Sequence, residues 1–222
     1  MGYALDFGAL LPYFSLFLRG AATTLGLTAL AAVVGTLLGI AGAAVLTGRC
    51  RMCKWPIAAY VELIRNTPFI VQMFFLFFGL PSLGIRLSAL AAAALAMTVN
   101  LAAYAIEIIR AGIEAVPESQ GEAGRGLGLR PVAVFGLIVL PQALANVYPA
   151  LVGQITITML ESAVVSQIAV VDLTHVADYI QSRNFRAFET YLAITVIYLV
   201  LALMLRRLMA RFGRRLFAGR SA

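Results

Sequence analysis

Glu161 is the residue that most needs a chemical explanation, because it is the only charged residue between Pro131 and Val171. A carboxylate near the middle of a membrane-spanning helix costs about 2.5–3.5 kcal/mol on insertion scales, so such a group usually faces a cavity or a partner. We therefore interpret Glu161 as a contact for a ligand. The alternative is that Glu161 pairs with a basic residue on another helix or on a neighbouring chain.

Four more polar residues occur in apolar segments at positions that suit a binding site. Ser162 follows Glu161, and Gln154 and Thr158 precede it at helical spacing, so these side chains form a polar stripe. Asn100 lies in the middle of a separate apolar segment and is a further candidate contact. The alternatives are that the Ser and Thr hydroxyls bond to carbonyl groups of their own helix and that Asn100 makes a helix–helix hydrogen bond.

Acidic and basic residues alternate at a spacing of three in two other places. Glu62 precedes Arg65, and Glu107 precedes Arg110, with Glu114 continuing the second series. Residues three or four apart lie on one face of a helix, so each acid is placed to offset its base. We interpret these residues as structural ion pairs or contacts at a gate, in preference to direct contacts with a ligand.

The sequence lacks the motifs of several kinds of active site. No GxxxxGK(S/T) motif is present, so we expect this chain to bind no ATP. Cys50 and Cys53 form one CxxC, which is half of a zinc site, and the only histidine, His175, is distant in sequence. We interpret both cysteines as free thiols in a reducing cytoplasmic loop. The sequence therefore predicts a chain that is not itself an enzyme and holds no metal or cofactor.

The composition is typical of a protein embedded in a bilayer. Of the 222 residues, 62% are hydrophobic and 12% are charged, and the mean hydropathy is +0.93. A soluble domain of this length needs more polar surface, whereas helices surrounded by lipid are apolar on all sides. The net charge of +7 is spread over short segments between apolar stretches. Basic loops beside anionic lipid explain this charge better than binding to nucleic acid.

Five membrane-spanning helices are predicted, because the hydrocarbon core needs roughly 20 apolar residues per helix. They cover about residues 21–46, 55–79, 87–109, 148–171 and 190–208 of a single transmembrane domain, 1–222. We expect Asn66-Thr67-Pro68 to interrupt the second helix and to free backbone groups that line a cavity. The predicted fold class is an all-α integral membrane protein.

The distribution of Lys and Arg predicts the orientation. Thirteen of them lie in segments 47–66, 107–130 and 206–222, which the five spans place on one side, and four lie on the other side. Segments rich in Lys and Arg stay in the cytoplasm. We therefore expect the N-terminus in the periplasm and the C-terminus in the cytoplasm.

A mixed segment between the third and fourth predicted helices contains a spaced motif. Glu122, Ala123 and Gly124 are followed by Gly128 and then by Ile138-Val-Leu-Pro141. This pattern resembles the EAA loop of ABC importer permeases, in which EAA, three residues, Gly, nine residues and I-x-L-P follow one another. All spacings match, and the one departure is Gly124 in place of the second Ala. A short helix that ends near Gly128, where a positive φ is easily adopted, suits insertion into a groove of a partner.

The resemblance to one family of these permeases extends further. Residues 60–75 and 103–117 are similar to Y-x-E-x-x-R-G-T-P-x-x-x-Q-x-F-F and A-Y-x-x-E-x-x-R-G-G-I-x-A-V-P of the permeases for His, Glu, Gln, Arg and opines, with Asn66 in place of Gly. The likeness covers about residues 20–208. It implies a five-helix type I importer core, in the bacterial inner membrane and surrounded by lipid, that pairs with an identical or different permease chain.

The same resemblance implies the other partners. Residues 112–141 are expected to form the coupling loop, which contacts a dimer of ATP-binding subunits that bind ATP and Mg. A periplasmic or lipid-anchored binding protein is expected to deliver a polar amino acid.

The family comparison also suggests a substrate class. The related permeases usually have K-x-T/S-x-L-x-S near Glu161, and this chain has Leu160 at the position of Lys. Losing a cation and holding an anion favours a basic substrate, such as arginine, lysine, histidine or an opine. The alternatives are the same complex with glutamine, glutamate or cystine as substrate, and a self-sufficient secondary transporter.

Overall fold

A computed structural model describes residues 5–48 and 50–217, and these fold into helices joined by short turns. The helices with α geometry are α1 (Phe14–Thr47), α2 (Arg51–Arg65), α3 (Phe69–Phe74), α4 (Ala89–Glu114), α5 (Glu118–Gly126), α6 (Pro131–Val134), α7 (Leu140–Glu161), α8 (Leu173–Asn184) and α9 (Ala187–Leu216). Tighter or wider helical turns are η1 (Phe7–Tyr13), η2 (Phe75–Gly79), η3 (Leu80–Leu83), η4 (Phe135–Val139) and η5 (Ser162–Ile168).

Four continuous helical stretches in the described residues are long and apolar enough to cross a membrane. They are Phe7–Thr47, Ala89–Glu114, Pro131–Ile168 and Ala187–Leu216. A further pair, Arg51–Arg65 and Phe69–Leu83, passes the same test together but is bent by 110°. The interruption expected at Asn66-Thr67-Pro68 is therefore present, and the pair makes a fifth span if it is counted as one broken helix.

The helix expected at about 148–171 has different ends in the structure. Its α-helical part begins at Pro131 and ends at Glu161, with the π-type turn η4 between α6 and α7. Pro141 and Pro149 both lie inside this stretch, and neither ends it. Membrane helices tolerate proline because local turns of other geometry satisfy the freed backbone groups. Residues 131–141, expected in the coupling loop, therefore belong to the long helix.

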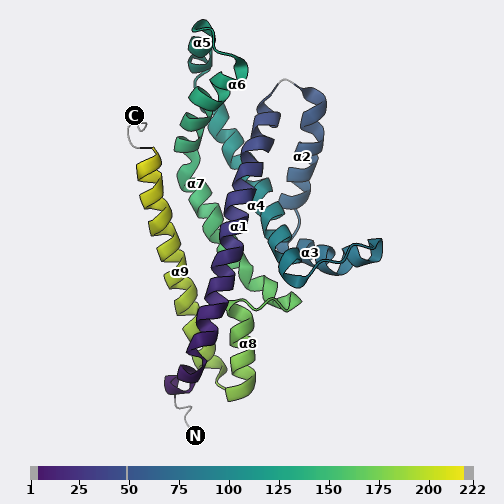
Figure 1. The fold of residues 1–222 in the computed structure, drawn as a ribbon, viewed down its shortest axis with the longest axis vertical. Helices are drawn as coiled ribbons and strands as arrows, with labels where there is room; N and C mark the ends of the chain where they lie inside the picture. Colours follow the sequence, from purple (N-terminus) through teal and green to yellow (C-terminus); the bar gives the residue numbers. More distant parts are fainter. Residues whose placement is uncertain (1–4, 49, 218–222) are drawn as a thin grey trace.

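The helices form an elongated bundle around α1 and α4 (Figure 1). Helix α5 lies at one end, whereas α8 and η1 lie at the other end (Figure 1). Helix α9 runs from the α8 end towards the α5 end, and α3 projects sideways (Figure 1). The described chain thus begins and ends in opposite halves of the bundle (Figure 1).

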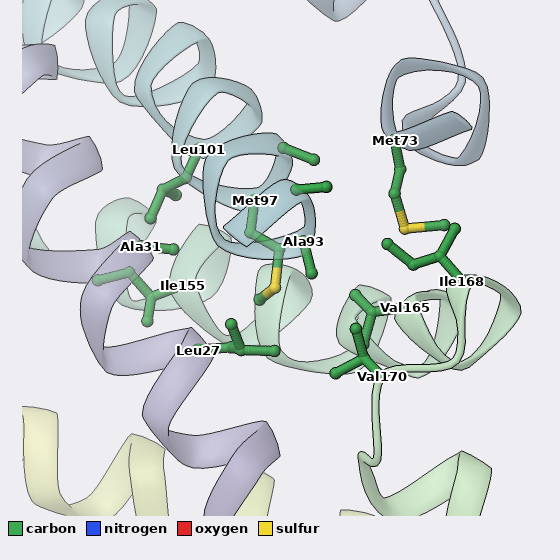
Figure 2. Packing of buried hydrophobic residues seen from close by; sticks show 12 residues of the cluster. Leu27, Ala31, Met73, Ala93, Met97, Leu101, Ile155, Val165, Ile168 and Val170 are labelled. Atoms are coloured by element: carbon green, nitrogen blue, oxygen red, sulfur yellow. The ribbon is translucent and has the colours of Figure 1, made fainter. Parts of the chain in front are cut away.

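The central core is formed where α1, α4 and α7 meet. Figure 2 shows Leu27 and Ala31 of α1 near Met97 and Leu101 of α4, with Ile155 of α7 in the same layer. Met73 of α3 extends this cluster towards η5. Figure 2 shows it beside Ile168 of η5, with Val165 farther from it. The interrupted segments therefore pack directly on the core.

Small residues allow α1 and α4 to approach closely. A Cβ atom built on Gly39 would lie 2.6 Å from the Cβ of Ala105, and one on Gly42 would lie 2.5 Å from Ile106 Cδ1. Lipid provides no hydrophobic drive between helices, so such close contact of backbones is a main source of attraction between them. By contrast, Gly26 on the same helix has no neighbouring atom within 4 Å of its built Cβ.

We expect Gly39→Ala to destabilise the protein by about 1–3 kcal/mol, because the added methyl group overpacks the α1–α4 contact. Gly26→Ala is the matched control and should be neutral or slightly stabilising, because alanine favours the helix and meets no neighbour. The measurement is the melting temperature of each purified variant in detergent. Equal melting temperatures for the two variants would show that this contact does not limit stability.

Asp172 ties α8 to the rest of the bundle at the end opposite α5. Its buried carboxylate accepts a hydrogen bond from the backbone N–H of His175 at 2.9 Å, as an N-cap of α8. The hydroxyl of Tyr198 on α9 donates to the other carboxylate oxygen at 3.2 Å. A Cβ on Gly20 of α1 would lie 2.9 Å from the carbonyl oxygen of Asp172. Burial raises the pKa of Asp172 above its ordinary value, although these hydrogen bonds act in the opposite direction.

The raised pKa of Asp172 predicts a dependence of stability on pH. The folded state holds this proton more tightly than the unfolded state, so the contribution is greatest below the unfolded pKa of about 4 and is lost as pH rises through the folded pKa. Asp172→Asn keeps an N-capping side chain and should flatten this fall in the melting temperature. Asp178→Asn, on the same helix, is the control. A slope unchanged in Asp172→Asn would exclude this carboxylate as its source.

Candidate functional site

Two interrupted helices meet beside α4. The break between α2 and α3 leaves backbone carbonyl groups without helical partners, and the side chain of Gln72 satisfies them. Its Nε2 donates to Ile64 O at 2.7 Å and to Thr67 O at 3.0 Å. Its Oε1 accepts a hydrogen bond from Asn100 Nδ2 at 3.0 Å. Gln72 therefore joins the break in one helix to the middle of another.

Asn100 makes the helix–helix hydrogen bond that was the alternative to ligand binding. The residue is only 3% exposed, and its Oδ1 has no hydrogen-bond partner among the described residues. Sequence reasoning did not single out Gln72. The sequence did indicate it, because Gln72 is the one amide residue in the apolar run that follows Pro68. The carbonyl groups that the interruption of the helix leaves unpaired there need a hydrogen-bond donor.

Glu161 is the last residue of α7, where the helical stretch Pro131–Ile168 changes into the turn η5, and it lies near one end of that stretch and not in its middle as expected. Its side chain is half-buried, and no hydrogen bond or ion pair of its carboxylate occurs within residues 5–48 and 50–217. Thr158, one turn earlier, is 1% exposed, and its hydroxyl is also without a partner in that part of the chain. An acid and a hydroxyl one helical turn apart thus both keep hydrogen-bonding capacity.

The other residues of the predicted polar stripe differ in whether their side chains hydrogen-bond to the backbone of their own helix. Ser162 donates to Met159 O at 2.7 Å, which is the bond to its own helix given above as the alternative. Ser166 does the same with Ala163 O at 2.9 Å. Gln154 is half-buried on α7. This part of α7 therefore offers Glu161 and Gln154 as half-buried groups and Thr158 as a buried hydroxyl, and the side chains of all three lack a hydrogen-bond partner in the described residues.

A network of ion pairs connects α2 with α4. Glu107 pairs with Arg110 at 2.8 Å, as expected, and Arg110 also pairs with Glu114 at 2.7 Å. The expected pair of Glu62 with Arg65 is wrong, because Arg65 reaches across to Glu107 at 3.6 Å and also lies over the ring of Tyr104. Spacing along one helix shows only the partners on that helix, and the facing helix offers the closer acid.

This network lines a cavity of about 660 Å³ between α1, α2 and α4. Lys54 and Glu62 also face it, so both signs of charge border the space. The cavity lies where α4 leads to α5. Its position is compatible with the gate contacts predicted from the sequence.

Helix α5 forms the end of the molecule (Figure 1). Glu122 and Ala123 are exposed on it, whereas Gly124 is buried against the following helix. A Cβ on Gly124 would lie 2.6 Å from Ile138 Cδ1, so this small residue allows α5 to pack closely on η4. Gly128 has φ of 79°, the left-handed value expected for a glycine after a helix end.

Leu127 is an exposed residue of this loop that sequence reasoning missed. Its side chain is 81% exposed at the C-terminal end of α5. The signal was present, because leucine is the only large apolar side chain between Pro117 and Arg130 other than Leu129. An apolar side chain beside Glu122 and Ala123 gives α5 a face that suits a protein partner.

The expectation of free thiols is contradicted, because Cys50 and Cys53 form a disulfide. Cys50 precedes α2 and Cys53 lies in its first turn, which places their Cα atoms 5.4 Å apart, within the range that a disulfide spans. Within the described residues, no group of three or more His, Cys, Asp or Glu side chains is placed to hold a metal ion.

Comparisons with known proteins agree with these features. Residues 35–218 match the family model of the binding-protein-dependent transport system inner membrane component. The arginine transport system permease protein ArtQ of Bacillus subtilis (strain 168) is 35% identical over 202 residues, 90% of this chain and 92% of the relative. The glutamine transport system permease protein GlnP of Escherichia coli (strain K12) is 30% identical over 213 residues, 95% of this chain and 97% of the relative.

Solved structures show the same fold. A crystal structure of an amino acid ABC transporter with histidines contains a chain that is 39% identical, with a TM-score of 0.86 over 96% of this chain and 100% of that chain. A chain of the MetNI methionine ABC transporter in an inward-facing conformation is 19% identical, with a TM-score of 0.77 over 92% and 98% of the two chains, and shows the likeness of fold alone. The chain therefore belongs to the family of binding-protein-dependent transport system inner membrane components and is a multi-pass inner-membrane permease of an ABC transporter.

Proposed function

We propose that this permease imports amino acids and favours those with a cationic side chain, such as arginine, lysine, histidine or an opine. It works with a second permease chain, two ATP-binding subunits and an external binding protein. The observation that carries the substrate class is Glu161, a carboxylate in a membrane-spanning stretch that has no cationic partner in the described chain. An arginine transport permease among the relatives supports this choice.

The surroundings of Glu161 suit a ligand better than a permanent ion pair. Irregular backbone at membrane depth is tolerated where it lines a cavity or is covered by protein. Glu161 lies where α7 changes into η5, and η5 packs against α3 beside the broken helix. Thr158 and the Oδ1 atom of Asn100 add unpaired polar atoms to this region. The cationic side chain of a basic amino acid would bind the carboxylate of Glu161. Its α-ammonium and α-carboxylate groups would hydrogen-bond to the neutral polar atoms.

Helix α5 is the element through which the ATP-binding subunits act on the membrane helices. Glu122, Ala123 and Leu127 form its exposed face, and Gly124 holds the opposite face against η4. Only residues 115–117 separate α5 from α4, and only residues 127–130 separate it from α6. A displacement of α5 therefore moves α4, which carries Asn100 and the ion pairs, together with α7, which carries Glu161.

The second candidate is the same complex with a neutral or acidic substrate. The glutamine permease of Escherichia coli matches almost the whole chain and favours this alternative. In that case Glu161 pairs with a basic residue of the second permease chain and does not contact the substrate. A secondary transporter is the third candidate, and the family membership argues against it.

The substrate proposal predicts the outcome of uptake by the complete complex in liposomes. Labelled arginine, lysine or histidine should enter only with ATP at the side of the ATP-binding subunits. Glu161→Gln should weaken the apparent affinity for arginine about ten- to a hundred-fold, because a charge-assisted hydrogen bond contributes about 1.5–3 kcal/mol. Glu161→Asp, which keeps the charge, should retain most of the uptake.

Other outcomes separate the three candidates. Uptake of glutamine or glutamate, with Glu161→Gln without effect on affinity, would disprove the role of Glu161 and keep the importer. Uptake that ignores ATP and collapses with an ionophore would overturn the importer itself.

The coupling proposal predicts a loss of contact with the ATP-binding subunit. Leu127→Ser should weaken binding of that subunit about tenfold, because an exposed apolar anchor of the interface is removed. Met52→Ser is the matched control, since Met52 is 88% exposed but lies on α2. Binding is measured with the purified permease in nanodiscs, together with ATP hydrolysis stimulated by the loaded binding protein. Equal loss in both variants would count against α5 as the specific contact.

A further inference from the structure

A second cavity lies between α7 and α9, and it is lined by neither Glu161 nor any residue of α5. Its volume is about 630 Å³. Tyr148, Pro149 and Val152 line it from α7. Its other walls are residues of α9 between Leu203 and Arg214, together with Phe217, which follows α9. We call it the α7–α9 basic cavity, because Arg206, Arg207 and Arg214 are among its walls.

The shape of this cavity is fixed by specific contacts. The hydroxyl of Tyr148 donates to the backbone oxygen of Met209 at 2.7 Å, which holds α9 against α7. The ring of Tyr148 also meets the ring of Phe217 edge to face, with centroids 5.3 Å apart. Gly213 has no side chain to displace Tyr148, and Ala210 projects only a methyl group into the space. The hollow is therefore held open between two tied helices.

The charges around the cavity have one sign. No acidic residue lines it, and within the described chain Arg206, Arg207 and Arg214 form no ion pair. Arginine binds phosphate oxygens through two parallel N–H donors, which makes it suited to a phosphodiester. Three unpaired arginines around a hollow thus form a receptor for an anion.

The polarity of the cavity changes along the helix axis. Its apolar end is formed by Val152 and Leu203, and α9 has no charged residue from Thr190 to Leu205. Arg214 lies eleven residues beyond Leu203, about 16 Å along a helix. The cavity therefore extends from the hydrocarbon region to the charged end of a membrane-spanning helix. A free anion would use only one end of it, whereas a phospholipid has an acyl chain for the other.

We propose that the α7–α9 basic cavity binds an anionic phospholipid, with its phosphate against Arg206, Arg207 and Arg214 and an acyl chain along Val152 and Leu203. Basic cavities between membrane helices on the cytoplasmic side are suited to anionic headgroups. The choice of lipid over a protein partner rests on the apolar end of the cavity. It also rests on α5, which lies at the end of the molecule (Figure 1) and whose exposed residues Glu122, Ala123 and Leu127 do not line the cavity.

The test measures lipid bound to the complete transporter complex in nanodiscs made of phosphatidylcholine with a small fraction of phosphatidylglycerol. Retained phosphatidylglycerol is quantified by native mass spectrometry. The double variant Arg207→Gln/Arg214→Gln should bind it about thirtyfold more weakly, because each arginine near an anionic membrane surface strengthens binding about fivefold and the two factors multiply. Ala210→Trp should also reduce retention by filling the cavity without changing charge.

The matched control removes the same charge from the same helix outside the cavity. Arg211→Gln/Arg215→Gln should leave retention within about twofold of the wild type, since neither residue lines the cavity. Equal losses in the two double variants would overturn a defined site in favour of general attraction to anionic lipid.

Two more outcomes would overturn the lipid assignment. Displacement of the bound lipid by millimolar inorganic phosphate or glycerol phosphate would identify a site for soluble anions. Loss of the ATP-binding subunit from the Arg207→Gln/Arg214→Gln complex, with lipid retention unchanged, would identify a protein contact. The expected result is retention of the subunit together with loss of the lipid.

Discussion

Between membrane helices, lipid chains are as apolar as leucine, so α1 and α4 gain stability by bringing their backbones close together. Gly39 and Gly42 of α1 allow this approach against Ala105 and Ile106 of α4. The remaining elements are arranged around that pair: α2 packs on one side, α7 and α9 on the other, and the interrupted segments pack on its core (Figure 1). Both the central polar region and the ion-pair network therefore take their positions from a contact formed by residues without functional groups.

The two interrupted helices show how a polar region is built without exposing backbone to lipid. Gln72 satisfies the carbonyl oxygens of Ile64 and Thr67 and leaves its own oxygen for Asn100. A change of helical geometry accomplishes the same end at Glu161, where η5 continues the chain with tighter turns. In both places the α-helix ends while its backbone groups stay paired. The polar side chains, Gln72 and Asn100 in one place and Glu161 in the other, lie where the helix ends.

Several features could be predicted from sequence because they depend on local rules. The uncharged run in α1, the break at Asn66-Thr67-Pro68 and the glycine with positive φ at Gly128 follow from composition or backbone sterics. The start of the long helix at Pro131, and not near residue 148, did not follow from these rules, because the π-type turn η4 continues the helix through residues that were expected in the coupling loop.

Ion pairs and hydrogen bonds between different helices could not be predicted from local sequence patterns. Periodicity placed Arg65 with Glu62, whereas the nearest acid is Glu107 on α4. The same limit applies to Gln72 and Asn100, which are separated by 28 residues. The cysteines were interpreted as free thiols because a single CxxC is only half of a zinc site, whereas the structure has a disulfide between them.

Helix α5 has one face that packs on η4 and one face that is exposed. Gly124 fixes the inner face on η4 through a contact that admits no larger side chain without displacement of Ile138, whereas Glu122, Ala123 and Leu127 occupy the outer face. In the proposed role of α5, a substitution on the outer face changes the contact with the ATP-binding subunit, whereas the packing of the inner face on η4 is unaffected. Recognition of that subunit and attachment of α5 to the membrane helices therefore depend on different residues of one short helix.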